Sequence, residues 1–198
     1  MEYSLLSLFL KKERGKELLK TIMKKIFFCT LFLFLLSFPL HAIDVPFNNT
    51  IAHIYFSPDG GCTDAIIKEI GKAKSEILIQ AYSFTSKPIA QAILKAHKAG
   101  IHVEIILDKS NKSAKYSAGV FTAHMEIPTF IDAEHAIAHN KIMIIDKETV
   151  IMGSFNFTKA AEEKNAENLL ILKSKELAKI YLDNWQKHKK HSTLYQGK

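Results

Sequence analysis

The side chains best suited to chemistry lie in one short stretch of the chain. In order, they are His139, Lys141, Asp146, Gly153, Ser154 and Asn156. An imidazole can act as a nucleophile, a lysine is a fixed cation, and hydroxyl and amide groups donate hydrogen bonds to anionic oxygens. Together these groups offer what cleavage of a phosphodiester needs when no metal takes part.

Two short apolar runs carry this stretch. Residues 141–145 read Lys-Ile-Met-Ile-Ile and residues 149–152 read Thr-Val-Ile-Met, with polar turn residues between them. The pattern predicts two adjacent strands joined by a tight turn. Alternate residues of a strand share a face, so His139 and Lys141 are expected on the same side. Asp146 is expected roughly 16 Å from Lys141, at about 3.3 Å per residue, which favours a structural role or a contact to another histidine.

The spacing of these residues resembles the HKD signature of the phospholipase D superfamily. Residues 55–63 and 80–85 are also similar to the opening of its single-motif bacterial branch, and residues 167–171 to its downstream acidic strand. The branch includes small secreted phospholipases D and nonspecific endonucleases. The resemblance covers about residues 51–190, and it implies an α/β/α sandwich around a mixed β-sheet.

The resemblance implies a metal-independent phosphodiesterase that works through a phosphohistidine intermediate. In such enzymes one motif histidine attacks phosphorus, while a second protonates the leaving alcohol and then activates water. His139 matches both roles, and the sequence contains no second H-x-K with the required spacing. We therefore expect a homodimer in which two copies of His139 form a shared active site.

Further roles follow from the same resemblance. Lys141, Ser154 and Asn156 match the residues that bind the phosphate oxygens of the substrate. Glu167 matches a carboxylate that orients the motif histidine of its own chain. Asp146 matches the motif aspartate, which is expected to support the histidine of the partner chain. The expected catalytic group therefore comprises His139, Lys141, Asp146 and Glu167.

A metal site is not expected from the sequence. His135 and His139 are four residues apart, a spacing that can bind metal on a helix, but Pro128 and the apolar run that follows argue against a helix. We find no cysteine or further histidine to complete such a site. We therefore expect neither a metal nor another cofactor, and we place His135 at the pocket entrance. The basic residues 187–191 are expected at a solvated helix end.

The N-terminal segment has a different composition from the rest. Lys24 and Lys25 precede an apolar run at residues 26–40, which predicts a signal peptide at about residues 23–42 and a secreted or periplasmic protein. The run is shorter than the ~20 residues of a membrane-spanning helix. Leu40 is large for its place in a cleavage site, so a membrane anchor is the alternative. Residues 1–42 are thus the predicted extension and signal peptide, and residues 43–198 the predicted catalytic domain.

Charge does not decide the substrate. The chain has a formal net charge of +7, but the 20 lysines and 17 acidic residues after residue 42 leave only +3. Nonspecific nucleic-acid binding depends on lysine and arginine contacts to phosphates. A domain with this low net charge and no arginine gives it only weak support. Cys62 is the single cysteine of the domain, so no intrachain disulfide is expected. A phospholipid and a nucleic acid both remain candidate substrates, with a non-catalytic binding module as the least favoured reading.

Alternating β and α elements in the rest of the chain predict an α/β fold. The expected strands are residues 51–57, 76–82, 101–107, about 128–131, 141–145, 149–152 and 168–172. The expected helices are residues 63–74, 86–99 and 174–190, with a short helix or loop at residues 158–164. Residues 109–125 are expected to hold short helices beside the substrate.

Overall fold

The structure of the chain is a computed structural model that describes residues 16–17, 19–27, 42–47, 50–112 and 118–197. It divides into two units, residues 1–44 and residues 45–198. In the first unit, the described residues between 16 and 27 are helical. Most of the predicted signal peptide lies outside the described residues, at residues 28–41. Among the helices that the structure describes, none has both the length and the apolar character needed to cross a bilayer.

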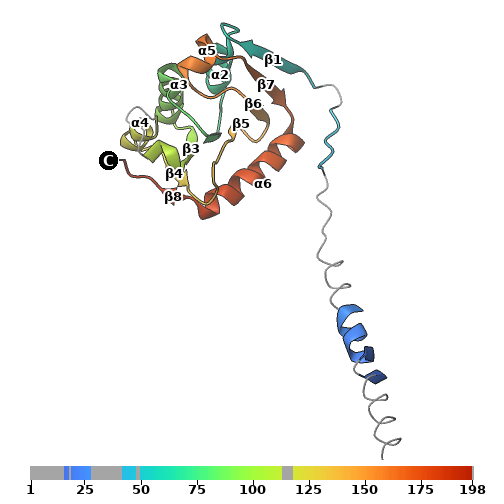
Figure 1. Cartoon of the computed structure of the whole chain (residues 1–198). Coiled ribbons are helices and arrows are strands. Elements are labelled where there is room, and N and C mark those ends of the chain that lie inside the picture. The colour runs from blue at the N-terminus through green and yellow to red at the C-terminus, as the bar shows by residue number, and fades with distance from the viewer. Residues whose placement is uncertain (1–15, 18, 28–41, 48–49, 113–117, 198) are drawn as a thin grey trace, which may run out of the picture. The chain divides into compact units, whose positions relative to one another are not determined.

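Within the described part of the second unit, eight strands form one mixed sheet (Figure 1). The strand order is β1-β7-β6-β5-β2-β3-β4-β8. Strands β2, β3 and β4 are parallel to one another, and every other neighbouring pair is antiparallel. The strands are β1 (Ala52–Ser57), β2 (Glu76–Ala81), β3 (His102–Asp108), β4 (Thr129–Asp132), β5 (Lys141–Ile145), β6 (Thr149–Gly153), β7 (Glu167–Lys173) and β8 (Thr193–Leu194).

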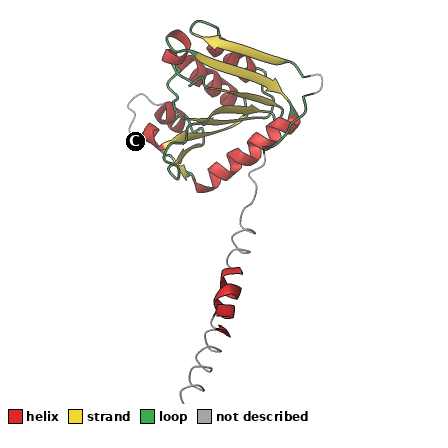
Figure 2. Cartoon of the chain, turned by 45° about the vertical axis from the view of Figure 1, so that its right-hand side comes forward, coloured by secondary structure: helices red, strands yellow, loops and turns green. Residues whose placement is uncertain are grey.

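Helices cover both faces of this sheet, and the long C-terminal helix lies across one of them (Figure 2). The helices are α2 (Cys62–Ile70), α3 (Lys87–Lys98), α4 (Ala118–His124), α5 (Lys159–Glu163) and α6 (Lys175–His191), with a short 3-10 helix, η1 (Lys109–Lys112). One buried apolar cluster joins the sheet to α2 and α3, and a second joins its other face to α6. The predicted α/β/α sandwich with a mixed sheet is therefore confirmed.

Rows of apolar side chains across neighbouring strands explain these two clusters. On the α2 and α3 face, the strand register aligns Ile79, Met143, Ile151 and Ile171. On the α6 face, one residue away along each strand, it aligns Leu78, Ile144, Val150 and Leu172. All eight side chains are buried. Burial of one such side chain contributes about 1.5–3 kcal/mol to the stability of the fold. A shift of a strand's pairing register by one residue would turn its apolar side chains to the other face and would lose this free energy at several positions.

Most predicted elements are present, and the differences have local causes. Helix α2 ends at Ile70, earlier than expected, because the following residues turn to donate backbone hydrogen bonds to the Asp146 carboxylate. Residues 109–125 contain η1 and α4, and the part between them lies outside the described residues. Strand β8 was not expected, because two residues are too short to show an alternating pattern.

Candidate active site

Lys141 is the first residue of β5, His139 lies two residues before it, and both contact the same aromatic ring. The His139 ring is exposed and tilted by 51° against the Tyr82 ring, with 4.6 Å between the ring centroids. The Lys141 ammonium lies 5.0 Å from the centroid of the Tyr82 ring and donates to the carbonyl oxygen of His139 at 2.7 Å. Only 6% of Lys141 is exposed. An accessible imidazole thus lies beside a nearly buried cation, on the shared side that the alternation predicted.

Hydrogen bonds between β2 and the start of β5 hold this arrangement. The Tyr82 backbone N–H donates to the Asn140 carbonyl at 2.9 Å, and the Asn140 amide donates to Gln80 Oε1 at 3.1 Å. The Asn111 amide in turn donates to the Tyr82 carbonyl at 2.7 Å. These bonds of Asn140 fix the backbone between His139 and Lys141.

Glu167 acts on Lys141 through its charge. It is the first residue of β7, and its carboxylate accepts a hydrogen bond from the Asn165 amide at 3.1 Å. Burial lowers the pKa of Lys141, and the negative charge of Glu167 partly opposes that effect. The net result is a pKa below the ordinary lysine value. The fold thus brings the predicted Glu167 within electrostatic reach of Lys141.

Ser154 and Asn156 follow β6 in a turn held by Asn168 of β7. The Ser154 hydroxyl oxygen accepts from the Asn168 backbone N–H at 3.0 Å and from its side-chain amide at 3.2 Å. A hydroxyl that accepts two hydrogen bonds keeps its own proton to donate. Among the described residues, the buried Oδ1 of Asn156 has no hydrogen-bond partner. This oxygen can only accept a hydrogen bond, so a phosphate oxygen would have to be bound by the amide nitrogen of Asn156.

Gly153 allows this turn to approach β7 closely. Its φ angle is 151°, and a Cβ atom at this position would lie 2.3 Å from the Asn168 carbonyl oxygen. Any larger residue would push β6 and β7 apart where Ser154 meets Asn168. The glycine of the predicted motif is therefore required by backbone packing.

A pocket of about 380 Å³ opens at this end of the sheet. Its polar and apolar walls include His139, Lys141, Asn168, Met152, Leu170 and Tyr181. Beside it, Ile54 and Phe56 of β1 are 60% and 67% exposed. Directly opposite them on β7 are Leu170 and Asn168, and side chains directly opposite in a sheet share a face. An exposed apolar rim therefore borders the pocket.

Asp146 lies at the other end of β5, in the turn before β6. Its carboxylate accepts from the backbone N–H groups of Lys74, Ser75 and Glu76 at 2.8–3.1 Å, and from the Ser75 hydroxyl. Burial alone would raise the pKa of Asp146, but these hydrogen bonds outweigh it and lower the pKa. Within one chain the structure does not bring Asp146 to His139; its contacts are structural.

One expectation about histidines was wrong. The sequence suggested no further histidine to complete a site with His135, whereas the expected solvated helix end is confirmed in part, because Lys187, Lys190 and His191 are exposed. The structure instead packs the rings of His188 and His191 near His135, with centroids 4.9 Å and 5.3 Å away. All three rings face the buried carboxylate of Asp132. The sequence carried only an H-x-x-H spacing at residues 188–191 as a signal.

Comparison with known proteins identifies the family. Residues 66–189 match the family described as "Cardiolipin synthase, PLD-like domain". A protein named phospholipase D from Rickettsia typhi is 41% identical over 140 residues, which cover 71% of this chain and 69% of that protein. The chain belongs to the phospholipase D superfamily. Its single HKD motif, from His139 to Asp146, places it with the single-HKD bacterial type.

Solved structures of phospholipase D superfamily proteins agree with this assignment. Nuc from Salmonella typhimurium, described as a phospholipase D family member, is 35% identical, with a TM-score of 0.72; the match covers 75% of this chain and 100% of Nuc. NucT from Helicobacter pylori is 26% identical, with a TM-score of 0.67, and the match covers 74% of this chain and 100% of NucT. A mouse mitochondrial cardiolipin hydrolase is 25% identical over 122 residues, which cover 62% of this chain and 55% of that protein. The family and these relatives support phosphodiesterase activity.

Proposed function

We propose that the protein cleaves phospholipids as a metal-independent phosphodiesterase, with His139 as the nucleophile. The observation that carries the proposal is the contact between the buried Lys141 cation and the backbone of the exposed His139, at a pocket with an apolar rim. A cation held in a water-poor environment stabilises charge on phosphoryl oxygens more strongly than a solvated one. We assign Ser154 and Asn156 the role of donating hydrogen bonds to the same phosphoryl oxygens.

The reaction takes two displacements at phosphorus. An imidazole nitrogen of His139 attacks phosphorus and forms a P–N bond, while the P–O bond to the leaving alcohol breaks and a second imidazolium gives that alcohol its proton. The second imidazole then takes a proton from water, and the resulting hydroxide displaces His139 to release the phosphate product. Imidazoles change charge between about pH 5 and 8, so one of a pair can be neutral while the other is protonated. Glu167 is assigned the role of orienting His139.

The second imidazole is proposed to be His139 of another copy of this chain. Within the described residues, His135, His188 and His191 already face Asp132, which leaves them poorly placed for this role. A twofold axis beside the pocket would bring two exposed His139 rings to one phosphorus atom. In such a homodimer Asp146 of the motif keeps its structural contacts, and any support of the partner histidine is indirect.

Phospholipid is favoured over nucleic acid by the surface around the pocket. Ile54 and Phe56 form an apolar rim that suits acyl chains, whereas a nucleic acid would be bound by basic side chains. Relatives at 41% and 45% identity, from Rickettsia typhi and Rickettsia conorii, are named phospholipase D. This rim also offers a surface for transient association with a membrane.

The test offers both substrates to the purified full chain. Vesicles of phosphatidylcholine with cardiolipin and, separately, plasmid DNA are incubated with the protein in EDTA, with His139→Ala as the control. We expect release of the lipid head group, no cleavage of DNA and an inactive variant. Cleavage of DNA alone would replace the lipid substrate with a nucleic acid. Loss of all activity in EDTA, with an unchanged Tm, would contradict the metal-independent mechanism.

The N-terminal segment is proposed to export the protein to the periplasm or the medium, with membrane anchoring as the alternative. Lys24 and Lys25 before the apolar run support an export signal. Mass spectrometry of the protein from fractionated cells checks this. A mature chain that begins near residue 43 is expected outside the cytoplasm, whereas an intact chain in the membrane fraction would favour the anchor.

A further inference from the structure

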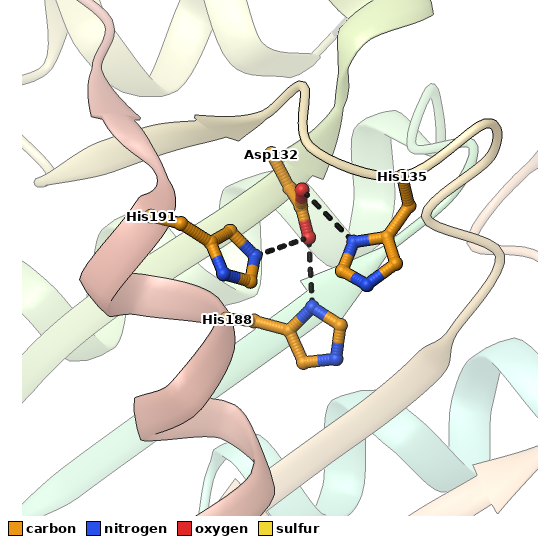
Figure 3. Close-up of side chains that lie close together, drawn as sticks. All are labelled: Asp132, His135, His188 and His191. Carbon is orange, nitrogen blue, oxygen red and sulfur yellow. Dashed lines mark hydrogen bonds and ion pairs between the residues drawn. The ribbon is translucent and has the colours of Figure 1, made fainter. Parts of the chain in front are cut away.

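Three histidines surround one buried carboxylate, apart from the proposed catalytic group (Figure 3). Asp132, the last residue of β4, has a side chain with 0% exposure. His188 Nδ1 and His191 Nε2 lie 2.7 Å and 3.2 Å from its Oδ2, and His135 Nδ1 lies 3.3 Å from its Oδ1. One potential ligand atom from each of the four residues lies within 4.8 Å of the other three.

The fold builds this arrangement from two distant segments. His188 and His191 are three residues apart on α6 and therefore share one helix face. Strand β8 follows this helix and pairs with β4, with Thr193 opposite Ile131, so the end of α6 lies beside Asp132. The same helix is held on the sheet by a buried ring, because the Trp185 indole donates to a β2 carbonyl at 2.9 Å.

We propose that Asp132, His135, His188 and His191 bind a zinc ion. Imidazole nitrogens and carboxylate oxygens are zinc ligands, and the four donors here are enough to complete a tetrahedral coordination sphere. Ligand atoms about 2.0–2.2 Å from zinc lie about 3.4 Å apart in a tetrahedron. The separations of 2.7, 3.2 and 3.3 Å between the three nitrogens and the carboxylate oxygens are close to this value. The backbone N–H of Glu134 donates to Asp132 Oδ1 at 3.1 Å and holds the carboxylate in place.

The site would stabilise the segment that leads into His139. His135 lies in the loop between β4 and β5, four residues before His139. The same loop is already held by Lys109, which donates to the His135 carbonyl at 3.0 Å, and by the Ala138 N–H, which donates to Asp108 at 2.8 Å. A zinc ion would add a bond between this loop and α6. It would take no part in the chemistry at phosphorus, so this inference is independent of the proposed function.

Metal titration of the full chain, carrying no histidine tag, tests the inference. The protein is freed of metal with EDTA, returned to chelator-free buffer and titrated with Co²⁺, then with Zn²⁺. We expect one Co²⁺ per chain with the visible absorption of a tetrahedral complex, and its displacement by one Zn²⁺. Saturation with zinc should raise the Tm by about 5–10 °C. A chain that binds no stoichiometric metal and shows no change in Tm would overturn the proposal.

Variants distinguish a zinc site from three histidines that only donate hydrogen bonds to Asp132. His188→Ala and the more exposed His191→Gln should each weaken Co²⁺ binding at least about 100-fold and remove the Tm gain. His53→Ala, at an exposed position of β1, should bind metal like the unaltered chain. If the His188→Ala protein does not fold, metal binding by the His191→Gln protein tests the assignment. Unchanged metal affinity in the folded variants would contradict the assignment.

Discussion

The Lys141 ammonium donates to the carbonyl oxygen of His139 at 2.7 Å, so the nearly buried cation is tied to the backbone that carries the exposed imidazole. We expect Lys141→Met to lower kcat by about 100- to 1,000-fold, because an apolar side chain of similar length cannot stabilise charge on the phosphoryl oxygens. The Tm should change little, because burial disfavours the lysine cation and an apolar side chain of similar length fills the same space. Steady-state kinetics with a soluble phosphodiester check this; an active Lys141→Met protein would remove Lys141 from the site.

Replacement of the nucleophile should separate activity from stability. His139→Ala is expected to lower turnover at least about 1,000-fold, because no P–N bond can form. The ring is exposed, so the unfolding midpoint in urea should stay close to that of the unaltered chain. Substantial residual turnover in a folded His139→Ala protein would count against the phosphohistidine mechanism.

A shared site makes the His139→Ala protein an inhibitor of the unaltered chain. If each active site needs His139 from both protomers, adding an equal amount of the variant to a fixed amount of unaltered chain should reduce activity to about half after subunit exchange. Light scattering should show a dimer for both proteins. Unchanged activity in the mixture, or a fully active monomer, would show that one chain suffices.

The turn after β6 should not tolerate a Cβ atom at Gly153. Gly153→Ala is expected to destabilise the fold by about 2–3 kcal/mol and to reduce turnover, because the new atom would displace Asn168 and with it Ser154. Gly71→Ala is a matched control, since its φ angle is helical and its Cβ would meet ordinary contacts. Urea unfolding of both variants checks this, and equal stability would show that the close approach is unimportant.

Asp146 should make the free energy of unfolding depend on pH in the acidic range. The ordinary pKa of an aspartate is 3.8, and the folded state lowers the pKa of the Asp146 carboxyl below this value. The stability that the ionised carboxylate contributes is therefore fully present above pH 3.8. It disappears as the pH falls through the lower pKa of the folded state. At pH 7, Asp146→Asn should lose about 1–2 kcal/mol of stability. The difference between the two proteins should shrink below about pH 3. A difference that stays constant from pH 7 to pH 2 would exclude this carboxylate as its source.

The apolar rim should matter for vesicles and not for soluble substrates. Phe56→Ser combined with Ile54→Ser is expected to lower vesicle turnover about 10-fold, because less apolar surface contacts the lipid. A soluble phosphodiester should be cleaved at the unaltered rate. Leu194→Ser, at an exposed site on the opposite edge strand, is the control. Equal losses with both kinds of substrate would point to a damaged site rather than to lipid contact.

The sequence by itself determined the elements whose geometry is local. Covalent spacing along one strand requires that His139 and Lys141 share a side, that Asp146 lies at the far end, and that a turn separates two apolar runs. Alternation of β and α patterns was enough for the α/β class. The HKD spacing was enough for the family, because its residues are close together along the chain, from two residues before β5 to the turn after it.

Only the tertiary structure decided which distant segments meet. Tyr82 against His139, Glu167 near Lys141, and Asp146 against residues 74–76 depend on strand order and register, which one sequence does not specify. The same holds for Asp132 and His188, which come together because β8 pairs with β4 and brings the end of α6 to that strand. Side chains far apart in sequence meet through the packing of the whole sheet, and no spacing rule along the chain encodes that packing.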